Sequence, residues 1–273
     1  MISSTANSKV KRLAALMQKA KMRREEQAFV VEGVKMFREA PAEWVREVYV
    51  SEGFLQKSER GKDAVLNNRL SQYHYEVLSE EVFQKVSDTQ TPQGILCVLS
   101  VPHYDLADRI DRMAAAGRIP FLILLEDLQD PGNLGTILRA GEGAGIDGVI
   151  MTKRTVDILN PKVIRATMGA IYRVPFFFVD HMSETIDFLQ RKGVTVYAAH
   201  LDDSVDYDEA DYTKPTAFLI GNEGNGLRRE TADQAEQYIK IPMAGQVESL
   251  NAAAAAAILM YEAARQRRRN AKH

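Results

Sequence analysis

The chain has 273 residues, of which 45% are hydrophobic and 26% charged, and its formal net charge is -2. This composition is typical of a globular protein that is large enough for two domains, and it excludes a collagen-like or disordered chain. A single cysteine, Cys97, excludes an intrachain disulfide, and the scattered histidines have no metal-binding spacing, so we expect no metal. Because the sequence has neither an apolar signal core nor a membrane-length apolar run, we expect a cytoplasmic protein.

Positive charge is concentrated at the two ends of the chain. Residues 1–24 carry seven Lys and Arg and no acid, and the last residues are also basic. Basic ends on an acidic body are typical of local contacts to a polyanion, because neutralising phosphates gives affinity without overall positive charge. A solvated helix face and a frayed tail would give the same pattern. The candidate RNA-binding residues are Lys9, Lys11, Arg12, Arg23 and Arg24.

The first hundred residues alternate between helical and strand-like patterns. Apolar residues at helical spacing within residues 5–24 predict one amphipathic helix with a cationic outer face. Strands are expected at residues 28–31, 45–50, 73–78 and 95–100. Ser79 is expected to cap a helix between the last two strands. The sequence therefore predicts a small α/β domain over residues 1–102.

A polar segment, residues 103–119, is expected to link this domain to a second one. Residues 121–125 are all apolar, which is typical of a strand that is buried on both faces of a parallel sheet. Further strands are expected at residues 148–151, 174–179, 194–199, 216–220 and 238–241. Helices are expected between them. The sequence therefore predicts a second α/β domain, residues 120–273, built largely on a parallel sheet.

Two loops of the second domain, residues 221–227 and 242–248, follow apolar strands and carry glycine and uncharged amides. Open α/β sheets bind ligands beyond the carboxyl ends of their strands, and glycine lets the backbone approach a ligand. The first loop is not a P-loop, because it has no lysine and Glu223 would repel phosphate. A glycine-rich connection without a ligand would look the same, so the loops alone leave both interpretations open.

Three segments carry a family resemblance. Residues 133–139 read N-L-G-T-I-L-R, residues 221–224 read G-N-E-G, and I-P-M at 241–243 runs to S-L-N at 249–251. In order and spacing they resemble the three motifs of the SpoU/TrmH-type RNA ribose 2′-O-methyltransferases of the SPOUT superfamily. Residues 1–105 are similar to the small L30e/L7Ae-like substrate-binding domain of ribosomal-RNA members. The resemblance implies a SPOUT-type α/β domain with a deep trefoil knot, preceded by a small L30e-like α/β domain.

The resemblance also implies a cofactor, a reaction and partners. The cofactor would be S-adenosylmethionine, and the reaction would be methylation of a ribose 2′-hydroxyl in RNA, with 23S ribosomal RNA as the expected substrate. A homodimer would form through the C-terminal domain. A tRNA substrate, or a non-catalytic RNA-binding or ribosome-assembly factor on the same fold, stays open. The implied cofactor contacts are Gly221, Ile241, Leu250, Ala199, Leu219 and Met243.

The resemblance gives the catalytic role to Arg139. A guanidinium stays protonated and is a poor base, so we expect Arg139 to bind the adjacent phosphate and stabilise negative charge on the attacking oxygen. The general base is left unassigned. The residues expected to orient Arg139 and shape the site are Asn133, Glu223, Ser249 and Asn251. Asn133 and Ser249 are also good helix N-caps, which is the alternative interpretation of both.

The last helix is expected to run from Ser249 to about Arg268 and contains six consecutive alanines, residues 252–257. Small side chains let another backbone come close, which suits either the dimer interface or a helix that is buried within one chain.

Overall fold

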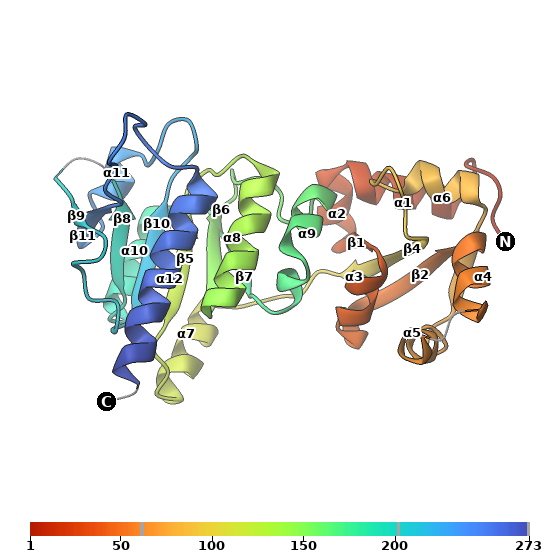
Figure 1. Cartoon of the computed structure of the whole chain (residues 1–273), viewed down its shortest axis with the longest axis horizontal. Coiled ribbons are helices and arrows are strands. Elements are labelled where there is room, and N and C mark those ends of the chain that lie inside the picture. Colours follow the sequence, from red (N-terminus) through yellow and green to blue (C-terminus); the bar gives the residue numbers. More distant parts are fainter. Residues whose placement is uncertain (61–62, 201–202, 272–273) are drawn as a thin grey trace. The chain divides into compact units, whose positions relative to one another are not determined.

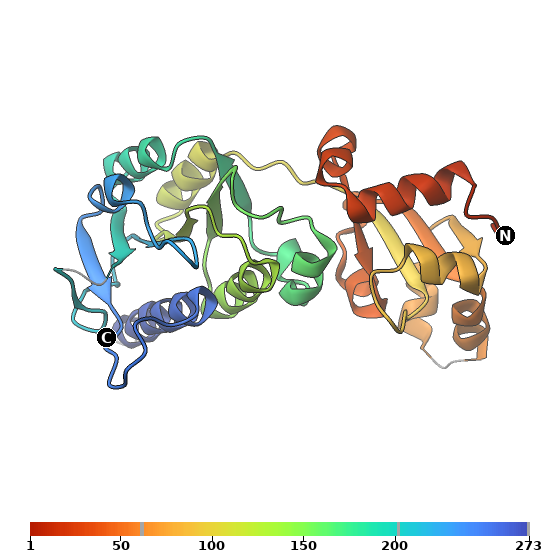
Figure 2. The ribbon, with the colours of Figure 1, turned by 90° about the horizontal axis from the view of Figure 1, so that it is seen from above.

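The computed structural model describes residues 1–60, 63–200 and 203–271, which form two compact units (Figures 1 and 2). The first unit is formed by Met1–His103 and Asp157–Tyr172, and the second by the described parts of Tyr104–Val156 and Arg173–His273.

This division differs from the limits expected from the sequence in two places. Within the expected linker, residues 103–119, helix α7 (Leu106–Ala115) belongs to the second unit, because Ile110 is buried in the core of that unit. Residues 157–172 belong to the first unit, where helix α9 (Pro161–Thr167) contacts the sheet.

The first unit is built on four strands, β1 (Ala28–Glu32), β2 (Val45–Ser51), β3 (Tyr75–Leu78) and β4 (Ile95–Ser100). Their order in the sheet is β1-β4-β2-β3, with β4 antiparallel to both neighbours and β2 parallel to β3. Besides α9, its helices are α1 (Ser8–Gln18), α2 (Ala20–Glu26), α3 (Val34–Glu39), α4 (Glu52–Arg60), α5 (Ala64–Leu70) and α6 (Glu80–Val86). Single 3-10 turns lie at Ala42–Trp44 and Ala170–Tyr172. Ser79 caps α6 as expected, whereas α5 was not predicted.

The expected single helix over residues 5–24 is wrong. The chain breaks between α1 and α2 at Lys19, whose backbone is extended with φ -119° and ψ 113°. The last carbonyls of α1 lose their helical partners at this break. The Arg23 guanidinium satisfies two of them by donating to the carbonyl oxygens of Leu16 and Met17 at 2.7 and 3.1 Å. It also pairs with Asp157 at 2.6 Å. Arg23 is therefore held inside the first unit.

The second unit contains a seven-stranded parallel sheet in the order β7-β6-β5-β10-β8-β11-β9. Its strands are β5 (Phe121–Leu125), β6 (Gly148–Thr152), β7 (Phe176–Val179), β8 (Thr195–Ala199), β9 (Val205–Asp206), β10 (Thr216–Ile220) and β11 (Gln237–Lys240). All six strands that the sequence predicted for this domain are confirmed. Among the described residues, only the short β9 was not predicted. Every residue of β5 and β10 is buried, as a central position in a parallel sheet requires.

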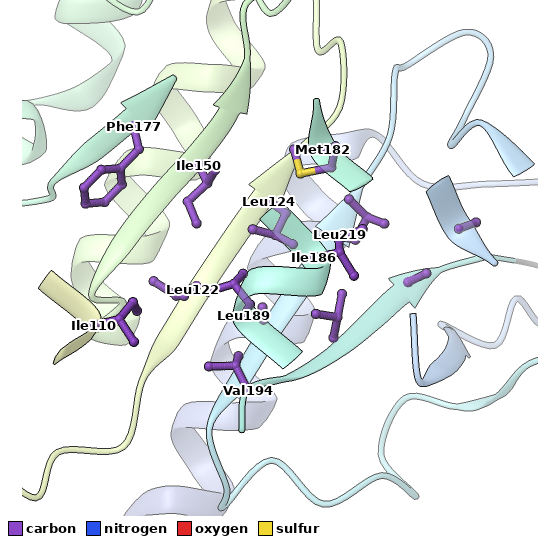
Figure 3. Close-up of a cluster of buried hydrophobic side chains, with 14 residues drawn as sticks. Ile110, Leu122, Leu124, Ile150, Phe177, Met182, Ile186, Leu189, Val194 and Leu219 are labelled. Carbon is purple, nitrogen blue, oxygen red and sulfur yellow. The ribbon is translucent and has the colours of Figure 1, made fainter. Parts of the chain in front are cut away.

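Helices cover both faces of this sheet. Besides α7 they are α8 (Pro131–Ala144), α10 (Met182–Arg191), α11 (Arg229–Ala232) and α12 (Ala252–Asn270). Helices α8 and α12 lie side by side on one face, and α7 and α10 lie on the other (Figures 1 and 2). Figure 3 shows Leu122, Leu124 and Leu219 of the central strands meeting Ile186 and Leu189 of α10.

We expect Leu124→Ala to lower the free energy of unfolding of the second unit by about 2–5 kcal/mol, because it removes a fully buried side chain from the centre of the sheet. Val247→Ala is the matched control, since the Val247 side chain is 62% exposed and its truncation should have little effect. Chemical denaturation of both variants measures the difference, and equal midpoints would contradict this description of the core.

Candidate active site

A cavity of about 1090 Å³ opens at the carboxyl end of the parallel sheet in the second unit. Its walls are the segments that follow β5, β8, β10 and β11, together with the first turns of α8 and α12. Small-molecule sites have volumes of roughly 300–1,000 Å³. The cavity therefore has room for a ligand of cofactor size and for part of a second molecule.

The cavity brings together most of the residues that the sequence predicted. The expected cofactor contacts Gly221, Ile241, Leu250, Ala199 and Met243 line it. So do Asn133, Glu223, Ser249 and Asn251. These residues are up to 118 positions apart in the sequence, so their convergence is a property of the fold.

Two predicted residues lie elsewhere. Leu219 is fully buried in the core on the α10 side of the sheet (Figure 3), so it does not contact the cavity. Arg139 is exposed on α8 and does not line the cavity either. It lies six positions after Asn133, which places it about 9 Å further along the helix. Among the described residues, none forms an ion pair with Arg139.

The loop after β10 is closed by its own hydrogen bonds. The backbone N–H of Asn222 donates to the Gly226 carbonyl at 3.0 Å, and the N–H of Gly226 donates back at 2.9 Å. The Asn222 side-chain oxygen accepts from the N–H groups of Gly224 and Asn225. A Cβ at Gly221 would lie only 2.3 Å from the carbonyl carbon of Gly226. This loop therefore needs glycine at residue 221 for its own closure, whatever it binds.

Glu223 joins this loop to the start of α8. Its carboxylate accepts from the backbone N–H groups of Gln129 and Asp130, at 3.0 and 2.9 Å, and from the Asn133 amide at 3.0 Å. Burial alone would raise the pKa of Glu223, but these three donors outweigh it, and the pKa lies below its ordinary value. Glu223 is therefore an ionised group that orients its neighbours and a poor proton acceptor.

The same network continues to α12. The Asn251 amide donates to the Asn133 side-chain oxygen at 2.9 Å, and the Asn251 oxygen accepts from the N–H groups of Ala253 and Ala254. Asn251 is thus the N-cap of α12. The alternative that Ser249 caps this helix is wrong, and the helix begins three residues later than expected.

Asn133 is not a helix cap either. The N-cap of α8 is Asp130, whose carboxylate accepts from the Asn133 N–H at 2.7 Å, and Pro131 follows it in the first turn. Asp-Pro is a good start for a helix, because proline has no N–H to satisfy there and its φ is already helical. That dipeptide was the signal that could have identified Asp130. Its capping leaves the Asn133 side chain free to join Glu223 to Asn251.

Comparison with known proteins identifies the family. Residues 120–261 match the SpoU rRNA Methylase family, and residues 7–97 match the MRM3-like substrate binding domain. The chain belongs to the SpoU rRNA methylase family. This confirms the resemblance that the three motifs indicated.

Relatives of this SpoU family chain match it over nearly its whole length. It is 32% identical over 260 residues to the 23S rRNA (guanosine(2553)-2′-O)-methyltransferase RlmP of Bacillus subtilis (strain 168), covering 95% of this chain and 97% of that protein. The AdoMet-bound rRNA methyltransferase from Sinorhizobium meliloti is 32% identical with a TM-score of 0.79, covering 97% of each chain. The SpoU methyltransferase AviRb from Streptomyces viridochromogenes, in complex with AdoMet, is 26% identical with a TM-score of 0.82, covering 96% of this chain and all of that one.

The five cations expected to contact RNA differ in how accessible they are. Lys9 pairs with Glu76, and Arg12 pairs with two carboxylates of the first unit. Arg23 is only 2% exposed, so it cannot reach a ligand in this conformation. Lys11 and Arg24 are exposed. Lys9 is exposed as well, but it is paired with Glu76, so Lys11 and Arg24 are the exposed candidates without a carboxylate partner among the described residues.

Neither a metal site nor a membrane span is found in residues 1–60, 63–200 and 203–271. No group of three or more His, Cys, Asp or Glu side chains there could hold a metal ion. No helix in this part is both long and apolar enough to cross a bilayer.

We expect Asn133→Ala and Asn251→Ala to be coupled, because their amides bond to each other at 2.9 Å. In a double-mutant cycle the free energies of unfolding should depart from additivity by about 1 kcal/mol. The control cycle pairs Asn133→Ala with Asn270→Ala at the other end of α12 and should be additive within about 0.5 kcal/mol. Equal coupling in both cycles would contradict the described network.

Proposed function

We propose that this chain binds S-adenosylmethionine (AdoMet) in the cavity of the second unit and transfers its methyl group to a ribose 2′-hydroxyl of RNA. The proposed substrate is 23S ribosomal RNA, because the RlmP relative is named for that reaction and matches almost the whole chain. The observation that carries the proposal is the network of Glu223, Asn133 and Asn251, which joins all three family motifs at one cavity.

The cavity suits AdoMet in its chemistry. Ile241, Met243 and Leu250 supply apolar surface, and the loop of residues 221–227 supplies backbone polar groups, so an adenosine could find both kinds of contact. Two solved relatives hold AdoMet, as their names state. The bound cofactor supplies an already activated methyl group on a sulfonium, so the protein needs mainly to position the two reactants.

The side chains in and near the cavity have different roles in positioning the reactants. Glu223 accepts a hydrogen bond from Asn133, and Asn133 accepts one from Asn251. These bonds fix the positions of the three side chains in the cavity wall. Arg139 stands outside the cavity on the exposed side of α8, where a phosphate of a bound RNA can reach it. Its guanidinium would neutralise that phosphate and stabilise negative charge on the 2′-oxygen as the proton leaves. Ser249 and Asn251 line the cavity, and we propose that they contact the nucleotide that is methylated.

The first unit would hold the RNA. Its match to a substrate-binding domain supports this role, and the exposed Lys11 and Arg24 are the cations that we assign to phosphate contacts. We propose an L30e-like fold for this unit, a trefoil knot around the loops of the second unit, and a cytoplasmic location, where ribosomal RNA is found.

We also propose a homodimer that forms through α12. Tyr261 of α12 is 48% exposed, and Ala254, two turns earlier in the same helix, is exposed as well. An apolar ring beside small side chains is suited to close packing against a second copy.

We expect Arg139→Ala to keep AdoMet affinity, because the residue lies outside the cavity, and to lower methyl transfer to ribosomal RNA by about 10²-fold or more. Calorimetry measures binding, and resistance of the product to alkaline cleavage at one nucleotide measures 2′-O-methylation. Arg112→Ala, at an exposed arginine of α7, is the control and should be fully active. Full activity of Arg139→Ala would remove Arg139 from the mechanism, and failure of the wild-type chain to bind AdoMet would favour a non-catalytic RNA-binding factor.

Light scattering at micromolar concentration should give twice the 30.6 kDa of one chain. Tyr261→Glu should convert the protein to monomers, because it places a charge in the proposed interface. Val65→Glu, at a 72% exposed apolar residue of α5, should leave the dimer intact. A wild-type monomer would exclude the dimer proposed here.

A further inference from the structure

Glu126 is a buried carboxylate beside the candidate site that the sequence analysis did not single out. It directly follows β5 and is only 1% exposed. A buried carboxylate needs hydrogen-bond partners, since an unpaired charge in the interior is unfavourable. The partners of Glu126 all belong to the chain segment that surrounds the loop of residues 221–227.

Glu126 is bonded to both ends of that loop. Its backbone N–H donates to the carbonyl oxygen of Ile220, the last residue before the loop, at 2.9 Å. One of its side-chain oxygens, Oε2, accepts from the backbone N–H of Arg228, the first residue after the loop, also at 2.9 Å. The residue directly after β5 therefore fixes where the loop leaves the sheet and where it returns.

The second carboxylate oxygen of Glu126 binds the chain segment that follows the loop. Oε1 accepts from Nε and Nη2 of Arg228 at 3.0 and 2.7 Å, and from the hydroxyl of Thr231 at 2.6 Å. The hydrogen bond to Glu126 raises the pKa of Arg228, as expected for a charge-assisted pair. The side chain of Arg228 is 48% exposed, so solvent screens its outer part, whereas the carboxylate itself is out of water.

The next residue along the chain, Asp127, binds the second residue of the loop. The Asn222 amide donates to the carbonyl oxygen of Asp127 at 2.9 Å. Asp127 has a φ of +56°, a left-handed conformation that aspartate tolerates and that turns the chain at this point. Residues 126 and 127 thus bind the residue before the loop, its second residue and the residue after it.

We propose that Glu126 is a positioning residue that presets the loop of residues 221–227 for AdoMet, with Arg228 and Thr231 as its partners. This inference rests on the proposed function, because it takes the cavity as the AdoMet site. A loop that is held at both ends before binding loses less conformational entropy when the ligand arrives, and its affinity is correspondingly higher.

The test compares Glu126→Gln with wild type in the full-length chain. The amide replaces one acceptor oxygen by a donor, so either the Arg228 N–H or the Arg228 and Thr231 side chains lose their partner. We expect AdoMet affinity, measured by calorimetry, to fall by roughly tenfold, the effect of about one charged hydrogen bond. Hydrogen exchange at the amides of residues 222–227, measured without AdoMet, should become faster by a similar factor.

Asp147→Asn is the matched control. Asp147 is also a buried carboxylate, 4% exposed, but it accepts from the N–H of Phe121 at the opposite end of β5. We expect this variant to unfold at a lower temperature with unchanged AdoMet affinity and unchanged exchange in the loop. Thr231→Val, which removes one hydroxyl donor, is the second variant if Glu126→Gln does not fold, and it should show the same changes to a smaller extent.

The outcomes separate the two proposals. If wild type does not bind AdoMet, the proposed function fails, and loop exchange still decides whether Glu126 holds the loop. If wild type binds and Glu126→Gln matches it in affinity and exchange, the positioning role is wrong. If Asp147→Asn weakens binding as much as Glu126→Gln does, the effect is general destabilisation and the positioning role is again wrong.

Discussion

The candidate site depends on one carboxylate that is shared between two loops. Glu223 belongs to the loop after β10, yet all three of its donors belong to the loop after β5 and the first turn of α8. Charge-assisted hydrogen bonds of this kind are stronger than neutral ones. Asn133 in turn accepts a hydrogen bond from Asn251, the N-cap of α12. The position of this final helix therefore depends on the same carboxylate. Changing Glu223 would therefore affect three segments together.

Much of the fold followed from the sequence, because its signals were local and strong. The all-apolar run at residues 121–125 was expected to be buried on both faces, and it pairs with the expected strand at residues 216–220 at the centre of the sheet. The convergence of Asn133, Glu223 and Asn251 came instead from the family motifs. The local sequence around these residues does not predict that they contact one another.

The errors arose where a partner distant in sequence, the choice of strand face or a neighbouring cap decided the outcome. Arg23 fits the polar face of a helix, but the break at Lys19 directs it to the end of α1 and to Asp157. Leu219 follows a family position in a strand whose side chains alternate between two faces, and it faces the core. For Asn133, the Asp130-Pro131 dipeptide could have shown that it is not the cap, but its bonds to Glu223 and Asn251 reach distant segments.

Most acidic side chains at the carboxyl end of the sheet accept structural hydrogen bonds, which limits their use as a general base. Glu126 receives donors from Arg228 and Thr231, Asp130 caps α8, and Glu223 receives three N–H groups. For Glu223 these donors hold the pKa below its ordinary value, so this carboxylate is a weak base. Catalysis by this site therefore has to rely on alignment of the reactants and on stabilising the oxyanion. A cation that is free of carboxylate partners among the described residues, as Arg139 is, suits that requirement better than any of these acids.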